Sequence, residues 1–142
     1  MRRFVLACLL AGAFAWSGCT SPPSTTPTTP SGPTTENYQG LIVPNGFVAH
    51  DFAAADTGPV TVTFTVMSPS IPMGFGLGTP PVVPGPGCNL TRSMVTTAGS
   101  AAQLSVTADA GLYCVELYDV GNLVGAVGPK GQGGFTITIV HP

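Results

Sequence analysis

Apolar and polar residues alternate in several stretches of the chain. In residues 60–66 three threonines separate four apolar residues, and the same period of two recurs over residues 113–118 and 135–139. This period is typical of β-strands that bury one face, because successive side chains point to opposite sides. Helical periodicity is absent. Apolar stretches between turn-forming residues predict five further, shorter strands, at 41–43, 47–53, 73–79, 90–95 and 103–107.

About eight short strands predict an all-β fold, an antiparallel β-sandwich of two sheets. A closed barrel is the alternative. In the strand at 60–66 the apolar residues, Val66 included, are expected to face the core. In the strand at 73–79 three glycines share one face, which permits close approach by backbone or aromatic rings. We expect this strand to lie at a sheet edge beside a proline-rich loop; the alternative is a ligand on the glycine face.

The N-terminus has the three parts of an export signal. Two arginines follow Met1, residues 4–16 are apolar apart from one glycine, and small residues precede Cys19. The residues before Cys19 resemble the lipobox of bacterial lipoprotein signal peptides, except that Trp16 stands where that family has an aliphatic residue. The resemblance implies a signal peptide over 1–18, cleavage before Cys19, and a diacylglycerol on its thiol. Plain secretion and a buried N-terminal helix are the alternatives.

A change of composition follows the signal. Residues 20–35 consist only of Thr, Pro, Ser and Gly, so this stretch cannot bury a core. Its prolines favour an extended spacer of up to roughly 50 Å. We therefore expect the lipidated cysteine and a disordered tether over 19–35, and the β-sandwich domain over 36–142.

Four cysteines divide between these regions. Cys8 leaves with the signal peptide and Cys19 is the expected lipidation site. Cys88 and Cys114 remain, and in an oxidising compartment we expect them to form a disulfide. A metal pair is the alternative, but it needs more thiolate or imidazole partners than the chain offers.

Charge excludes some functions. Only 7% of the residues are charged and the formal net charge is −2, so the chain has no basic patch for nucleic acid.

No catalytic motif occurs. His50 and Asp51 are neighbours and would point to opposite faces of a strand, and His141 is expected to be solvated. We therefore predict that the protein is not an enzyme and uses no cofactor.

A weak calcium hypothesis rests on Asp119 and Asn122. Val120 and Gly121 separate the two residues, whose side-chain oxygens are the ligand type that Ca²⁺ prefers. Asx residues beside glycine also form ordinary turns, and the turn is the favoured interpretation. Apart from this pair we expect no metal site.

The run Gly-Leu-Tyr-Cys-Val-Glu-Leu-Tyr-Asp at 111–119 resembles a strand of bacterial pre-peptidase C-terminal domains, and the strands at 60–66 and 135–139 fit the same pattern. The chain is also similar to small exported hypothetical proteins that share its Tyr-Cys-Val and Tyr-Asp-Val-Gly-Asn segments. The resemblance implies a jelly-roll-like, non-catalytic sandwich in secreted or surface proteins. Pre-peptidase C-terminal domains normally accompany a protease. This sequence contains no protease, so the role of a protease accessory domain does not carry over to it.

Together these observations predict an exported lipoprotein of the bacterial envelope, at the periplasmic face or the cell surface. Its membrane partner is the bilayer, through the lipid on Cys19. The β-sandwich is expected to be an interaction or structural module that contacts an envelope protein or a glycan. A carbohydrate-binding surface module is the alternative, and an accessory domain of a secreted hydrolase is a more remote one.

Overall fold

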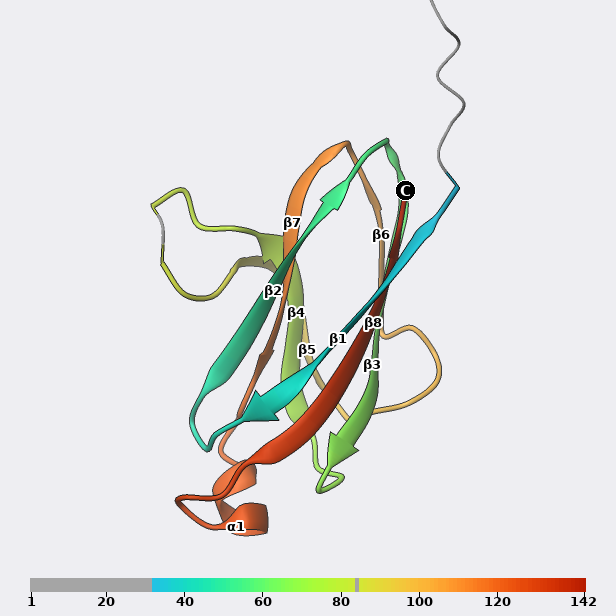
Figure 1. The fold of residues 1–142 in the computed structure, drawn as a ribbon. Helices are drawn as coiled ribbons and strands as arrows, with labels where there is room; N and C mark the ends of the chain where they lie inside the picture. The colour runs from blue at the N-terminus through green and yellow to red at the C-terminus, as the bar shows by residue number, and fades with distance from the viewer. Residues whose placement is uncertain (1–31, 84) are drawn as a thin grey trace, which may run out of the picture.

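Two antiparallel sheets of four strands pack face to face in the computed structural model, which describes residues 32–83 and 85–142 (Figure 1). The first sheet has the order β1-β8-β3-β6, and the second β2-β7-β4-β5. The strands of the first sheet are β1 (Thr34–Ile42), β8 (Gly133–His141), β3 (Gly58–Ser68) and β6 (Leu104–Ala108). Those of the second are β2 (Phe47–Ala54), β7 (Gly111–Tyr118), β4 (Met73–Thr79) and β5 (Asn89–Thr96). One short helix, α1 (Leu123–Val127), links β7 to β8.

This strand order is that of an eight-stranded jelly roll, in which consecutive strands repeatedly cross between the two sheets. The predicted all-β sandwich is therefore confirmed, and the closed barrel is wrong. The predicted signal peptide, Cys19 and most of the predicted tether lie outside the described residues. Among the residues that the structure does describe, no helix is long and apolar enough to cross a membrane.

The core lies between the sheets and uses the alternation seen in the sequence. Phe64 of β3 and Phe75 of β4 are completely buried, and their rings meet across the sheets with centroids 5.8 Å apart. The inward residues of β7 and β8 are buried as expected; they are Val115, Leu117, Phe135, Ile137 and Ile139. Burial of such aliphatic and aromatic side chains is the main stabilising contribution in a sandwich of this kind.

One core position differs from the prediction. The pairing of β3 with β8 shifts register between Phe64 and Val66, which indicates a β-bulge. The bulge turns Val66 outward, where it is 50% exposed, and Met67 takes the inward position with 6% exposed.

The domain also begins earlier than expected. β1 starts at Thr34, two residues before the predicted boundary at Glu36, and Thr34 and Thr35 pair with His141 and Val140 of β8. No apolar pattern marks these two threonines, because their contribution to the fold is backbone pairing at a sheet edge. The helix α1 was likewise not predicted, since five residues are too few to show helical periodicity.

The position of β4 corrects another expectation. β4 is not an edge strand but lies between β7 and β5. Its glycine face is covered by neighbouring side chains, Tyr118 over Gly74 and Leu90 over Gly76. The chain itself therefore fills the space that the glycines leave.

Candidate functional site

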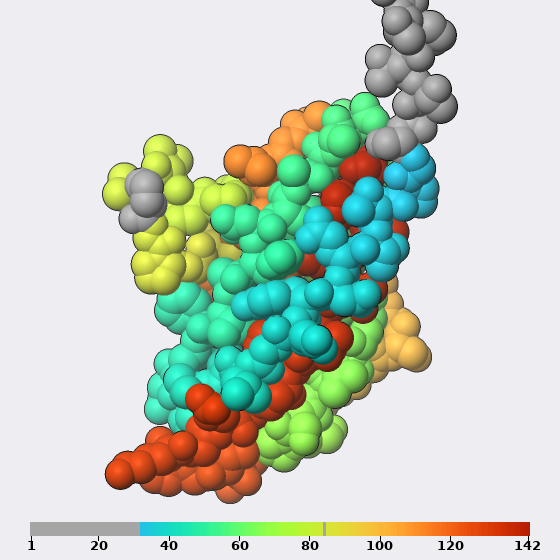
Figure 2. Space-filling view, in the orientation of Figure 1, coloured from blue at the N-terminus to red at the C-terminus, as the bar shows by residue number. Residues whose placement is uncertain are grey.

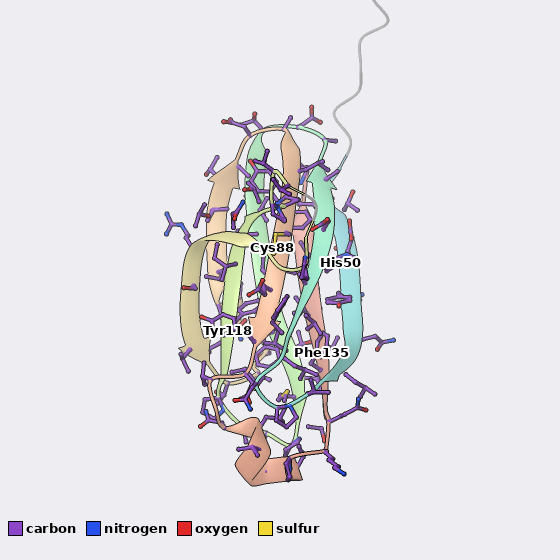
Figure 3. All side chains as sticks on the ribbon, turned by 90° about the vertical axis from the view of Figure 1, so that its left-hand side faces the viewer. His50, Cys88, Tyr118 and Phe135 are labelled. Carbon is purple, nitrogen blue, oxygen red and sulfur yellow. A yellow bond between two sulfur atoms is a disulfide. The ribbon has the colours of Figure 1, made fainter. Side chains whose placement is uncertain are left out.

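A carboxylate lies between two histidines where β1 and β2, the edge strands on one side of the sandwich, come together. Glu36 Oε2 is 2.9 Å from His50 Nε2, and Glu36 Oε1 is 3.0 Å from His141 Nε2. Glu36 stands on β1, His50 on β2 and His141 on β8, so these contacts join the two sheets. We call Glu36, His50 and His141 the His-Glu-His cluster; His50 is labelled in Figure 3.

Aromatic rings and backbone complete this cluster. The Tyr38 ring stacks on the His50 ring with centroids 4.6 Å apart, and Phe52 lies 5.2 Å from the His141 ring. His141 Nδ1 is 3.1 Å from the carbonyl oxygen of Pro142, so both ring nitrogens of His141 face acceptors.

The pKa values of the cluster reflect these contacts. The hydrogen bond from His50 is the largest cause that lowers the pKa of Glu36, and the bond from His141 adds to it against the opposing effect of burial. Burial raises the pKa of Tyr38. The carboxylate is thus held ionised, with each oxygen already occupied by an imidazole.

This arrangement corrects one prediction and supports another. His141, expected to be solvated, is buried with only 4% exposed. His50 and Asp51 do point to opposite sides of β2, because His50 stands opposite the buried Val115 whereas Asp51 stands opposite Cys114 on the outer face. The sequence contained a signal for the cluster: His141 continues the inward alternation of Ile137 and Ile139. The inward position of His141 was not predicted, because the prediction followed apolar residues and histidine is not one of them.

Asp119 has a structural role in place of the proposed calcium site. Its Oδ1 accepts hydrogen bonds from the backbone N–H groups of Gly121, Asn122 and Leu123, and its Oδ2 accepts one from Asn45. The Asn122 side-chain amide donates to the carbonyl oxygen of Pro72. Burial acts to raise the pKa of Asp119, but the four backbone hydrogen bonds outweigh it and lower this pKa. The pair therefore forms the turn, and its oxygens are not directed at a shared ion.

Cys88 and Cys114 form a disulfide, as predicted, with Cα atoms 6.0 Å apart. Figure 3 shows it on the outer face of the second sheet. Beside it, the backbone N–H of Cys88 donates to Glu116 Oε2 at 2.7 Å. Both contacts fix the connection between β4 and β5 to β7, and Cys114 is completely buried beneath this connection.

The outer face of the first sheet carries a shallow groove of about 410 Å³. Gly134 of β8 pairs with Leu41 of β1 and with Ser68 of β3. The exposed side chains in the lining are Leu41, which is 60% exposed, and Val66, which is 50% exposed. The rest of the lining comes from Gln39, Gly40, Phe135 and Thr136, so the groove carries no charged side chain. Its volume is in the range of small-molecule sites, but it is open and has few converging polar groups.

Each strand edge carries a feature that opposes pairing with another chain. β1 and β2 direct Glu36 and His50 toward the interior, and inward ionisable residues of this kind protect edges. On β5, Arg92 stands opposite the buried Leu77, next to a register shift that interrupts the edge. The remaining edge strand, β6, has five residues. The edges are therefore poor sites for β-strand addition.

No group of three or more His, Cys, Asp and Glu side chains within residues 32–83 and 85–142 is arranged to hold a metal ion. Comparison with known proteins adds no relative: no protein-family model matches the chain, and no curated protein matches its sequence.

Proposed function

We propose that the protein is a lipid-anchored, non-catalytic module of the bacterial cell envelope, exported by its signal peptide and held at the membrane through Cys19. The jelly-roll domain serves as an interaction module at the end of a Thr/Pro tether. Its likeness to pre-peptidase C-terminal domains agrees with a non-catalytic role in an exported protein.

The observation that carries this proposal is the engagement of the acidic side chains. Acid–base catalysis needs an ionisable side chain, most often His, Asp or Glu, with a free position toward the substrate. Four of the six acidic residues are instead bound within the domain. Glu36 contacts two histidines, Glu116 holds Cys88, Asp119 holds four backbone N–H groups, and Asp109 accepts from Thr57.

The exposed apolar side chains favour a partner that makes apolar contacts over a sugar that stacks on aromatic rings. Carbohydrate sites commonly present aromatic rings, whose apolar faces pack while a polar edge stays wet. Among the large apolar side chains that are exposed in the described ranges, Phe47 is the one aromatic residue. Aliphatic residues make up the rest, so we place the carbohydrate-binding alternative second.

Cell fractionation tests the anchor. The wild-type protein should be found in the membrane fraction, and Cys19→Ser should move it to the soluble exported fraction or leave it as an unprocessed precursor of higher mass. Cys8→Ser is the matched control, because this cysteine lies within the signal peptide and should change nothing. Membrane retention of Cys19→Ser at wild-type mobility would contradict the proposal.

A glycan array and a pull-down from envelope extract, both with the intact protein, separate the interaction partners. A protein captured by the wild type and lost on changing exposed aliphatic residues supports the interaction module. Saturable glycan binding would favour the carbohydrate-binding alternative.

A further inference from the structure

Two adjacent valines project from the connection between β4 and β5. We call residues 80–83 and 85–88 of this connection the valine loop. Val82 is 96% exposed and Val83 77% exposed, the two highest values among the exposed large apolar residues. The valine loop stands out from the side of the sandwich in Figures 1 and 2. An adjacent pair of apolar side chains at the tip of a projecting loop is an unfavourable arrangement in water unless it has an apolar partner.

The base of the valine loop is held rigidly. The Cys88–Cys114 disulfide and the hydrogen bond from Cys88 to Glu116 fix its second arm to β7. Gly87 has a φ of +93° and its backbone is close to the Phe47 ring and the Glu116 carboxylate, so no side chain fits there without strain. Prolines stiffen the loop further. A pre-formed loop loses little conformational entropy when its tip becomes buried.

Val82 and Val83 project from the surface, so a partner has to surround both side chains with apolar groups. A lipid bilayer does so, because its acyl chains are fluid. Residues 20–31 precede the described domain, and in an extended conformation at about 3.1 Å per residue they would span on the order of 40 Å. A domain on such a tether remains within reach of the membrane that holds its lipid anchor.

We propose that Val82 and Val83 insert into the interfacial layer of the bilayer to which Cys19 anchors the chain. The inference rests on the proposed lipid anchor. Two valines are a weak membrane contact alone, but the tether makes their insertion intramolecular and so raises their effective concentration at the surface. Insertion would hold the domain against the membrane with the second sheet facing it, and would leave the groove of the first sheet open to partners.

This contact is hydrophobic and not electrostatic. The valine loop contains no charged residue, and the nearest charges on the outer face of β2 and β7 are the acidic Asp51 and Glu116. The described domain has six acidic residues and two basic ones, Arg92 and Lys130, for a formal net charge of −4. Insertion should therefore need no anionic lipid, and anionic lipid should weaken it.

Tryptophan fluorescence tests the inference, because the sequence has one tryptophan, Trp16, and it belongs to the predicted signal peptide. Lipidated Val82→Trp protein is purified from membranes and reconstituted into phosphatidylcholine vesicles with brominated acyl chains. Val66→Trp is the matched control, an exposed valine on the outer face of the opposite sheet. Unchanged melting temperatures in detergent show that both variants fold.

We expect the emission of Val82→Trp to shift to the blue and to be quenched at least about twofold more than that of Val66→Trp, since an interfacial residue lies roughly 5–10 Å into the boundary of the acyl chains. Vesicles that also contain phosphatidylglycerol should give weaker quenching. Equal quenching of the two variants, or none, would overturn the inference.

Two other results would also overturn it. A blue shift that appears only when envelope proteins are added would assign the loop to a protein partner. A blue shift that rises with protein concentration, without quenching by bromine, would indicate contact between copies. Failure of the lipid anchor is recognised separately, because protein without acylated Cys19 would not remain with the vesicles and the quenching is measured only on vesicle-bound protein.

Discussion

The Tyr118 ring of β7 lies directly over Gly74 of β4, in the space that a side chain at position 74 would occupy. The two residues are directly paired across the strands, so the ring packs flat on the glycine backbone. Leu90 of β5 stands opposite Gly78, and its side chain reaches over Gly76. The outer face of the second sheet thus has a second, smaller packed layer, to which the valine loop is attached.

Gly74→Ala should therefore destabilise the domain. An added Cβ would overlap the Tyr118 ring and force it to move, and overpacking of this kind costs about 1–3 kcal/mol. Urea denaturation measures the change in the free energy of unfolding. Gly125→Ala in α1 is the control, because no atom lies within 4 Å of the added Cβ, and it should be neutral or slightly stabilising. Equal effects of the two changes would contradict the packing of Tyr118 on Gly74.

Loss of the disulfide should also destabilise the domain. In the double variant Cys88→Ser/Cys114→Ser the unfolded chain is no longer closed into a loop, and we expect a loss of roughly 2–4 kcal/mol. For a domain of this size the melting temperature should fall by about 10–20 °C. The protein exported under native conditions should show no free thiol at these positions until it is reduced. Two reactive thiols in the untreated folded protein would disprove the bond.

Glu36→Ala should destabilise the contact between the edges of the two sheets. It leaves the buried His141 Nε2 without an acceptor, and an unsatisfied buried polar group costs about 1–3 kcal/mol. In a double-mutant cycle with His141→Ala, the two losses should sum to more than the loss in the double variant. Asp56→Ala, at an exposed turn, is the control and should change little. Strict additivity of Glu36→Ala and His141→Ala would indicate that the contact contributes no coupling energy.

Acid should unfold the domain through Glu36 and Asp119. The pKa of each carboxyl is lower in the folded state than in the unfolded chain, where the ordinary values are about 4.3 and 3.9. The resulting stabilisation is present above those ordinary values and is lost as the pH falls through the lower, folded pKa. We expect Asp119→Asn to reduce stability at pH 7 and to flatten its dependence on pH below about 5. An unchanged slope in the variant, measured by urea denaturation at several pH values, would contradict this role of Asp119.

Truncation distinguishes the tether from the domain. A chain that begins at Gly32 should melt at the same temperature as one that begins at Thr20, because the tether is expected to be dispensable for folding. A chain that begins at Glu36 should melt lower, since it lacks the pairing of Thr34 and Thr35 with β8. If the chain that begins at Glu36 melts at the same temperature as the chain that begins at Gly32, the pairing of Thr34 and Thr35 adds no stability and the domain begins at Glu36.

The sequence was sufficient to predict the sandwich, because alternation in the strands at 60–66, 113–118 and 135–139 reports directly which face is buried. It was also sufficient to pair Cys88 with Cys114, since few cysteines remained. It did not reveal the bulge at Val66 or the central position of β4, because both depend on pairing with strands distant in sequence. The His-Glu-His cluster was not predicted for the same reason, because Glu36 and His141 are separated by 105 residues in the sequence.

The mass of the mature protein, purified intact from the membrane fraction, tests the central claim most directly. The account predicts a chain that begins at Cys19, with the added mass of a diacylglycerol on the thiol and a mass lower by two hydrogen atoms for the Cys88–Cys114 disulfide. A mature chain that begins at another residue, or an unmodified Cys19 at the N-terminus, would contradict it.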